Sequence, residues 1–411
     1  MEYAHGSSGT EPQPVAGEPP PSPVDTAANL IDALNRARPG DTITLRSQEY
    51  KVETPLFVLD GVTLQGAIMM QLDAQGLPVG FQGTTTTITA NAPNFPGNLL
   101  TLGNQSLVRR VRLDGANQVG FDGDGCGGNV VAVASPGKDK IVSATIEECE
   151  LINKLPSAGG SDSDGPTGGA ILAYTRNPQK PAPPDPPPHE GARVTVTVRR
   201  SIVDAPNKGK AVFAMNFASG GRVTVKLENN VVRGPLDVIG GLSRPDAVFG
   251  ATTTIDSGGN HFSPQSGSGA EAWQIIGGSS SPFGGNANAD SNTARVKSTD
   301  DQIENFLDGI VAIGGRQLPG GGTCSNNTVN LTLTGMKPPS NPLRGAAGFE
   351  FEGARSIGAL PAGHNNAVVV EVFAGPTSDR LCRIDLHDAG IGTRNQLVFK
   401  GTLAAFTQRS P

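Results

Sequence analysis

A short strand-forming pattern returns along most of the chain, separated by intervals of variable length. Val194–Val203 (VTVTVRRSIV) and Val223–Val232 (VTVKLENNVV) show it most clearly, since apolar and polar residues alternate up to a polar bend. Alternation with a period of two is typical of a strand with one buried face. Self-similarity at a period of tens of residues predicts a stacked architecture in which each repeat covers its neighbours. Further copies are Val108–Leu113, Ala144–Ile152, Thr252–Phe262, Ala294–Ile303, Val329–Leu333 and Val368–Phe373.

A second apolar strand follows each bend, for example Val130–Val133 (VVAV) and Ala211–Met215 (AVFAM). Two or three short strands per repeat would stack like residues into a continuous apolar column, as in a β-helix. A β-propeller also repeats at tens of residues, but variable spacing and missing Trp-Asp signatures disfavour it. Asn229, Asn230 and Asn260 fall at the bends and are expected to be structural, because Asn tolerates left-handed backbone.

The composition is typical of an ordered β protein. Among 411 residues, 55 are glycine and 33 proline, yet 36% are hydrophobic and cluster in alternating runs bounded by turn residues. That distribution predicts many short strands and tight turns. Residues 1–24 are expected to be a flexible Pro/Gly-rich leader, and they lack the basic and apolar regions of a signal peptide.

Charge and hydropathy exclude two classes of partner. The net charge is −6, whereas a nucleic-acid-binding protein needs a basic stripe. No run of eighteen apolar residues is present, so no membrane span is expected. The four cysteines, Cys126, Cys149, Cys324 and Cys382, match no zinc spacing. They are expected to form either two disulfides or buried free thiols.

One helix is predicted, over about residues 26–38, with Asp25 as its cap and Pro39-Gly40 as its end. Its apolar face comprises Ala27, Leu30, Ile31 and Leu34. The next stretch contains Ala37–Leu45 (ARPGDTITL), then Tyr50, then Gly61–Gly66 (GVTLQG). Together these segments resemble the start of a right-handed parallel β-helix of the pectin-lyase-like superfamily.

The resemblance implies an all-β fold: a single-stranded right-handed parallel β-helix over residues 25–411, closed at its N-terminal end by the α-helix. Its specific motif is confined to the first coils. The active-site elements of pectate lyases, polygalacturonases and pectinesterases are missing from the sequence, so no catalytic residue is carried over. Fold-level likeness alone does not assign a function.

Long loops interrupt the repeats and are where binding is expected. Two of them hold paired aspartates at the same place in consecutive repeats: Asp122 and Asp124 (FDGDG), and Asp162 and Asp164 (SDSDG). Clustered carboxylates favour Ca²⁺, and paired carboxylates also serve glycosidic cleavage. Ordinary solvated turns are the simpler interpretation. A third, Pro-rich loop over about residues 177–191 is expected to be extended.

Basic residues follow the acidic loops in the next repeats. A uronate lyase needs a base and a group that neutralises the substrate carboxylate, and a solvated surface is the competing interpretation. The catalytic candidates are Lys210, Arg233 and Arg244, and the substrate-binding candidates are Lys208, Arg200 and Trp273. Trp273, the only tryptophan, would stack on a sugar if exposed and would belong to the core if buried.

The preferred hypothesis is an extracellular or cell-surface protein that recognises extended glycans along a solenoid face. Whether it is a polysaccharide lyase, a glycosidase or no enzyme is left open. The alternative class is a non-catalytic structural or surface protein: an adhesin, an envelope component or a fibre subunit. The expected partner is a polysaccharide or a cell-surface glycan, Ca²⁺ is the candidate cofactor, and association into a homo-oligomer is left open.

Overall fold

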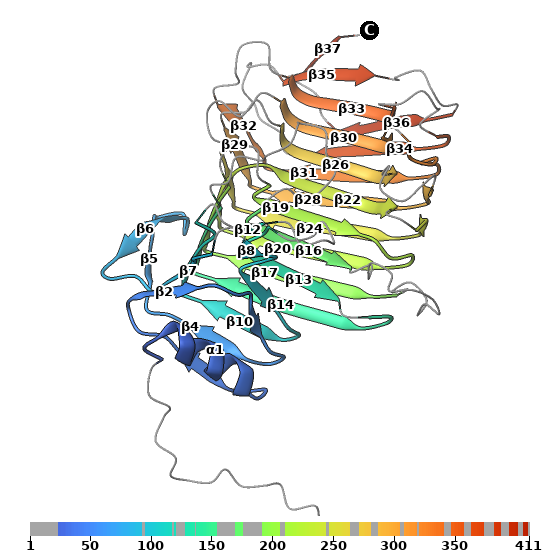
Figure 1. Cartoon of the computed structure of the whole chain (residues 1–411). Coiled ribbons are helices and arrows are strands. Elements are labelled where there is room, and N and C mark those ends of the chain that lie inside the picture. Colours follow the sequence, from blue (N-terminus) through green and yellow to red (C-terminus); the bar gives the residue numbers. More distant parts are fainter. Residues whose placement is uncertain are drawn as a thin grey trace, which may run out of the picture.

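Three long parallel sheets make up the molecule, and successive coils of the chain add strands to them (Figure 1). The computed structural model describes residues 24–409 except 93–94, 117–118, 121–127, 136, 154–168, 176–190, 206–209, 244–245, 264–270, 281–286, 305–307, 319, 341–346, 357–362, 374–381, 388–393 and 402–405. Within a coil the chain passes from sheet 1 to sheet 2 to sheet 3. Parallel crossovers of this kind are almost always right-handed. The chain is a right-handed parallel β-helix, as predicted.

Sheet 1 consists of β1 (Thr42–Thr44), β4 (Thr63–Gln65), β10 (Ser106–Arg109), β14 (Ile141–Glu147), β17 (Arg193–Arg199), β20 (Arg222–Glu228), β24 (Thr252–Gly258), β28 (Thr293–Thr299), β31 (Thr328–Thr334), β34 (Ala367–Phe373) and β36 (Gln396–Gly401). Sheet 2 consists of β2 (Glu49–Val52), β7 (Thr87–Ala90), β11 (Arg112–Asp114), β15 (Glu150–Ile152), β18 (Ile202–Asp204), β21 (Val231–Arg233), β25 (His261–Phe262), β29 (Gln302–Glu304) and β32 (Lys337–Ser340).

Sheet 3 consists of β3 (Leu56–Val58), β9 (Leu100–Leu102), β13 (Val131–Ser135), β16 (Ile171–Thr175), β19 (Val212–Asn216), β22 (Leu236–Ser243), β26 (Glu271–Ser280), β30 (Asp308–Gln317), β33 (Ala347–Ser356), β35 (Cys382–His387) and β37 (Phe406–Arg409). Three small pairs complete the strands: β5 (Met69–Leu72) with β6 (Pro78–Gln82), β8 (Phe95–Pro96) with β12 (Val119–Gly120), and β23 (Val248–Phe249) with β27 (Ala289–Asp290). Only β5 and β6 pair antiparallel among the described strands.

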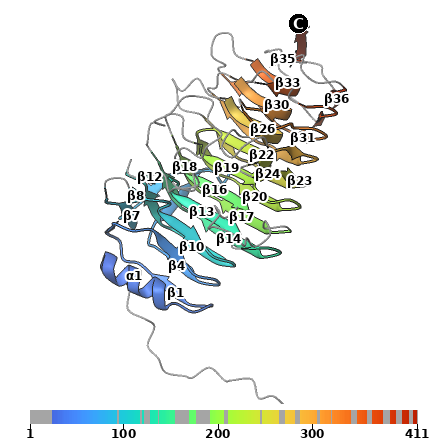
Figure 2. The same cartoon turned by 45° about the vertical axis from the view of Figure 1, so that its right-hand side comes forward.

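The register between coils keeps inward-facing side chains in line, and Figure 2 shows the strands stacked like rungs along the axis. In sheet 1, Val108 pairs with Ile146, which pairs with Val198, which pairs with Leu227. All four side chains are buried in one apolar core. Burying such a side chain contributes about 1.5–3 kcal/mol. Stacking of like residues therefore drives the fold.

The bend between sheets 1 and 2 is two residues long and repeats its shape from coil to coil. Its first residue has a positive φ, for example 58° at Arg110, 53° at Glu148, 49° at Arg200, 54° at Asn229 and 55° at Asp300. Left-handed backbone costs most L-residues about 1–2 kcal/mol. Because the shape recurs even at arginine and glutamate, the stacking of coils and not local preference sets this conformation.

The second residue of the bend points inward, and these side chains hydrogen-bond from coil to coil. The backbone N–H and Nδ2 of Asn230 donate to Asn260 Oδ1 at 2.8 and 2.9 Å. The same groups of Asn260 donate to Asp301 Oδ1 at 2.8 and 3.0 Å, and the Ser201 N–H donates to Asn230 Oδ1 at 2.9 Å. We call these four buried residues the bend ladder. The structural role expected of Asn230 and Asn260 is confirmed.

Asp301 is the one carboxylate of the bend ladder, and burial raises its pKa although four hydrogen bonds oppose the shift. A carboxyl whose folded-state pKa is raised weakens the fold above that pKa, and the penalty fades as pH falls through it. We expect Asp301→Asn to stabilise the protein by about 1 kcal/mol at about pH 7.5 and to lose this gain towards pH 4.

Urea unfolding of parent and variant across this pH range tests the expectation. An asparagine at this position keeps the oxygen that accepts from Asn260, and its amide would donate to Ser298 Oγ, which now donates to Asp301 Oδ2 at 2.7 Å. A variant less stable than the parent at every pH would show that the charge itself is needed in the ladder.

A second ladder lies at the corner between sheets 3 and 1. The N–H of Asn292 donates to Asn327 Oδ1 at 2.8 Å, and Asn327 and Asn366 each donate to the next asparagine at 2.9 Å, ending at Asn395. The strands of sheet 3 pass so close that a Cβ on Gly278 would overlap the Asn327 side chain. Paired glycines on β22, β26 and β30 therefore leave room for the ladder.

The helix α1 (Ala27–Arg36) covers the N-terminal end of the solenoid. Its leucines Leu30 and Leu34 are buried against the first coil. The prediction of Asp25 as cap is wrong: Thr26 Oγ1 accepts from the Asn29 N–H at 3.1 Å, because Thr26 is the residue with extended backbone directly before the helix. No helix in the described part of the chain is long and apolar enough to cross a membrane.

Candidate functional site

In consecutive coils the segments that join sheet 2 to sheet 3 connect the same two sides of the solenoid. They join β11 to β13, β15 to β16 and β18 to β19, which are the predicted acidic and basic loops. Outside the described residues lie Asp122, Asp124, Asp162, Asp164, Lys208 and Arg244. Calcium binding by the four aspartates stays a prediction. Within the described residues, no group of three or more His, Cys, Asp or Glu side chains could hold a metal ion.

Lys210, the described end of the basic loop, forms a buried ion pair with the next coil. Its Nζ lies 2.5 Å from Asp237 Oδ2, and the two side chains are 23% and 6% exposed. Burial acts to lower the pKa of Lys210, but the Asp237 carboxylate more than offsets it, so the pKa is raised. Because a lysine that holds its proton is a poor general base, the environment does not favour the predicted base role of Lys210.

Asp237, the acidic partner of this pair, is the more deeply buried of the two. Burial raises the pKa of its carboxyl group, Lys210 opposes the shift, and the charge of Glu271 adds to it. Asp237 Oδ1 is buried without a hydrogen-bond partner in the described structure. Buried polar atoms rarely stay unpaired in native proteins. Among the buried carboxylate oxygens on the described strands of sheet 3, Asp237 Oδ1 therefore stands out as the one left unpaired.

Polar side chains continue from the pair along the outward face of sheet 3. Asp237 is in register with Gln274, and Arg316 Nη1 donates to Gln274 Oε1 at 3.2 Å. Glu271 begins the same strand, β26. We call Lys210, Asp237, Glu271, Gln274 and Arg316 the sheet 3 site. The apolar column of Leu172, Phe213 and Val311 is the one that Asp237 and Gln274 interrupt, and Tyr174, Met215, Ile239, Ile276 and Ile313 form a second apolar column beside it.

Because these apolar side chains are buried, they form a second apolar cluster on the outward side of sheet 3. Beyond the sheet 3 site, the polar row ends in an internal ion-pair cluster. Arg355 donates to Glu352 from Nε and Nη2 at 2.6 and 2.7 Å and to Glu350 at 2.7 Å. Within this row Arg355 is paired with two carboxylates, whereas Asp237 Oδ1 has no hydrogen-bond partner among the described residues.

The other predicted cations lie elsewhere on the solenoid. Arg200, in the bend between sheets 1 and 2, has Nη2 3.2 Å from Glu148 Oε1. Arg233, on sheet 2, has Nη1 3.4 Å from Asp204 Oδ2. The structure does not gather them with Lys210, because β21 and the bend belong to different faces from sheet 3. Their proposed roles in catalysis and substrate binding stay predictions without a shared site.

Trp273 is fully buried, so the prediction that it binds substrate is wrong. Its ring packs edge-on against Phe262, with ring centroids 5.0 Å apart. The residue lies on β26 at a position facing inward, between Ala272 and Gln274. The alternative interpretation, that the ring belongs to the core, is confirmed.

Two of the four cysteines are buried free thiols, Cys149 and Cys324. Burial raises the pKa of each to about 12. The thiol alternative is therefore confirmed for these two and the disulfide alternative is wrong for them. A thiol that holds its proton at neutral pH is a weak nucleophile, so neither is a catalytic candidate.

No family model and no curated protein matches the chain. Among solved structures, the A-module of the mannuronan C-5 epimerase AlgE6 of Azotobacter vinelandii is 14% identical, with a TM-score of 0.40, 94% of this chain covered and 95% of that one. The surface adhesin PfbA of Streptococcus pneumoniae is 10% identical, with a TM-score of 0.40 and 89% of each chain covered.

A mannuronic acid specific polysaccharide family 6 lyase from human gut microbiota is 10% identical, with a TM-score of 0.28, 94% of this chain covered and 90% of that one. At these values the chain is similar to the three proteins in fold alone. Its assignment as a right-handed parallel β-helix protein rests on its own strand pairing. Membership of the pectin-lyase-like superfamily stays a prediction.

Proposed function

We propose that this chain is an extracellular or cell-surface protein that recognises an extended polysaccharide across the outward face of sheet 3 and cleaves it. One observation carries the proposal: a buried aspartate, Asp237, has one oxygen held by Lys210 and the other unpaired among the described residues. A buried carboxyl group with a raised pKa and a free oxygen is typical of a proton-transferring group in an active site.

The chemistry that this arrangement supports best is hydrolysis of a glycosidic bond. In this proposal the raised pKa lets Asp237 take up a proton on Oδ1 and give it to the leaving oxygen, and Lys210 donates to Oδ2 and stabilises the carboxylate that results. Glu271 supplies a second carboxyl group on the neighbouring strand β26, three residues before the register partner of Asp237. Two carboxyl groups in different environments are the basis of acid–base catalysis in most glycosidases.

The competing proposal is a non-catalytic surface protein such as an adhesin, an envelope component or a fibre subunit. The ion pairs of Arg355 with Glu350 and Glu352 favour it, because they link neighbouring side chains of one strand and need no ligand. Association into a homo-oligomer belongs to this alternative and stays a prediction.

Incubation with a panel of neutral and uronate polysaccharides separates these proposals. We expect the parent protein to release reducing ends, and Asp237→Asn to lower that rate by a factor of about 10²–10⁴. Binding of the same polysaccharide should change little, since asparagine keeps an oxygen for Lys210. Asp32→Asn, on the exposed face of α1, is the matched control and should be fully active. Unsaturated products would indicate a lyase, and binding without any cleavage would indicate the surface-protein class.

A further inference from the structure

The outward face of sheet 1 carries an excess of free positive charge over β17, β20, β24 and β28. The cations are Arg193, Arg222, Lys226, Arg295 and Lys297, all exposed. None of the five has an ion-pair partner within the described residues, and only two exposed carboxylates share these strands, Glu228 and Asp256. The chain as a whole has a net charge of −6. The charge of this face is therefore opposite in sign to that of the whole chain. Unpaired cations on one rigid face attract anions.

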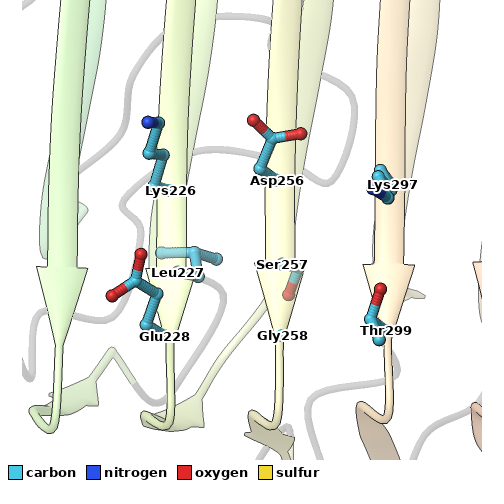
Figure 3. A pocket seen from close by; sticks show the side chains of 8 residues that line it. All are labelled: Lys226, Leu227, Glu228, Asp256, Ser257, Gly258, Lys297 and Thr299. Carbon is cyan, nitrogen blue, oxygen red and sulfur yellow. The ribbon is translucent and has the colours of Figure 1, made fainter.

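A depression of about 360 Å³ lies within this face, and Figure 3 shows the side chains around it. Its physical cause is a missing side chain. Glu228 is in register with Gly258, and Gly258 with Thr299, so the column has a gap at its centre. The strands hold this gap rigidly, because β20, β24 and β28 pair in parallel along their whole length.

Two lysines flank the depression from the neighbouring column. Lys226 is in register with Asp256, and Asp256 with Lys297. The two lysines therefore stand two strands apart, about 10 Å at the usual strand spacing. Figure 3 shows Lys226 and Asp256 projecting from adjacent strands on the same side of the depression. Cations at this spacing can each contact an acidic group of one extended chain, while Glu228 and Asp256 can accept hydrogen bonds from hydroxyl groups.

We propose that this face binds a linear polyanionic glycan, with one sugar ring over Gly258 and carboxylate or sulfate groups on Lys226 and Lys297. A glycan fits better than a nucleic acid, because its hydroxyl groups can donate to Glu228 and Asp256, whereas phosphate groups offer these carboxylates no donor. Outward threonines of the same strands add hydroxyl partners: Thr195, Thr197, Thr224 and Thr254. The proposal goes beyond the cleavage proposed for sheet 3, since it concerns another face and does not involve Asp237.

The test compares two double variants of the full chain that have the same net charge. Lys226→Ser with Lys297→Ser removes the flanking lysines, whereas Lys51→Ser with Arg36→Ser removes two exposed cations from sheet 2 and from α1. The probes are polygalacturonate and dextran sulfate, with neutral dextran as the uncharged control, in affinity electrophoresis at low salt. We expect the first double variant to bind the polyanions about tenfold more weakly than the parent and the second to bind like the parent.

Neutral dextran should not bind, and rising salt should weaken the polyanion complexes because the contacts are exposed. Preference between the two probes identifies carboxylate or sulfate as the natural group. If both double variants bound the polyanions equally weakly, the effect would come from net charge alone and the proposal would be overturned. Unchanged binding in the first double variant would overturn it as well. Stronger binding of duplex DNA at the same lysines would also overturn it. Asp237→Asn should bind the polyanions like the parent, which keeps this outcome separate from that at sheet 3.

Discussion

Replacing Asn260 by alanine is expected to lower the free energy of unfolding by about 3–5 kcal/mol. Asn260 Oδ1 accepts from the N–H and Nδ2 of Asn230, and Asn260 Nδ2 donates to the Leu227 carbonyl at 2.8 Å. The side chain is 1% exposed, so water cannot replace these partners. Each buried group left unpaired costs about 1–3 kcal/mol, and alanine leaves several at once.

Chemical denaturation of three variants measures this effect. The stability of Asn260→Ser should lie between those of the parent and the alanine variant. Ser201 occupies the equivalent bend position two coils earlier, and its hydroxyl already makes such bonds: its Oγ accepts from the Cys149 N–H and donates to the Arg199 carbonyl. The control is Asn229→Gly, an exposed position with a φ of 54° where glycine is unstrained. It should change the stability by less than about 1 kcal/mol. A loss in the alanine variant no larger than in this control would mean that the ladder contributes little.

The stacking of coils could be predicted from the sequence, because it depends on a pattern that each repeat shows by itself. Alternation in Val194–Val203 and Val223–Val232 already places valines on one face, and the structure pairs these strands in register. The bends were harder to predict. Arg110 and Glu148 have positive φ, against their local preference, because neighbouring coils impose it. The glycines that make room for the Asn327 ladder were a missed signal, since the Ile-Gly-Gly sequence recurs at Ile276–Gly278 and Ile313–Gly315.

The candidate site could be predicted only in part. Lys210 was identified, but its partner was not, although alternation in Leu236–Ile239 (LDVI) already turns Asp237 away from the core. The alternating pattern does not predict that this outward face is buried, yet Asp237 is only 4% exposed and Arg316 only 6%. That burial depends on the three-dimensional course of the chain between strands. The position of Trp273 could not be predicted for the same reason. A lone aromatic residue in an apolar strand can lie on the inward or the outward face.

The Lys210–Asp237 pair is the second place where a large effect is expected. Lys210→Met should lower the free energy of unfolding by about 3 kcal/mol at about pH 8, because it leaves a buried carboxylate without its cation. Without Lys210 the pKa of Asp237 rises further, since only the lysine opposes burial. A carboxyl group with a raised pKa costs stability above that pKa. The loss in Lys210→Met should therefore shrink as pH falls and Asp237 takes up a proton.

A double-mutant cycle isolates the pair from the packing around it. Asp237→Leu combined with Lys210→Met should return to within about 1 kcal/mol of the parent, because an apolar pair can replace a buried ion pair. Asp237 follows Phe213 in the register of sheet 3, so a leucine there extends the apolar column. The matched cycle uses Arg36→Met and Asp32→Leu, an exposed pair 2.9 Å apart on α1, with a coupling energy below about 0.5 kcal/mol. Equal coupling in both cycles would mean that the sheet 3 pair is hydrated like a surface pair, and Asp237 would then lose the raised pKa on which its role as proton donor depends.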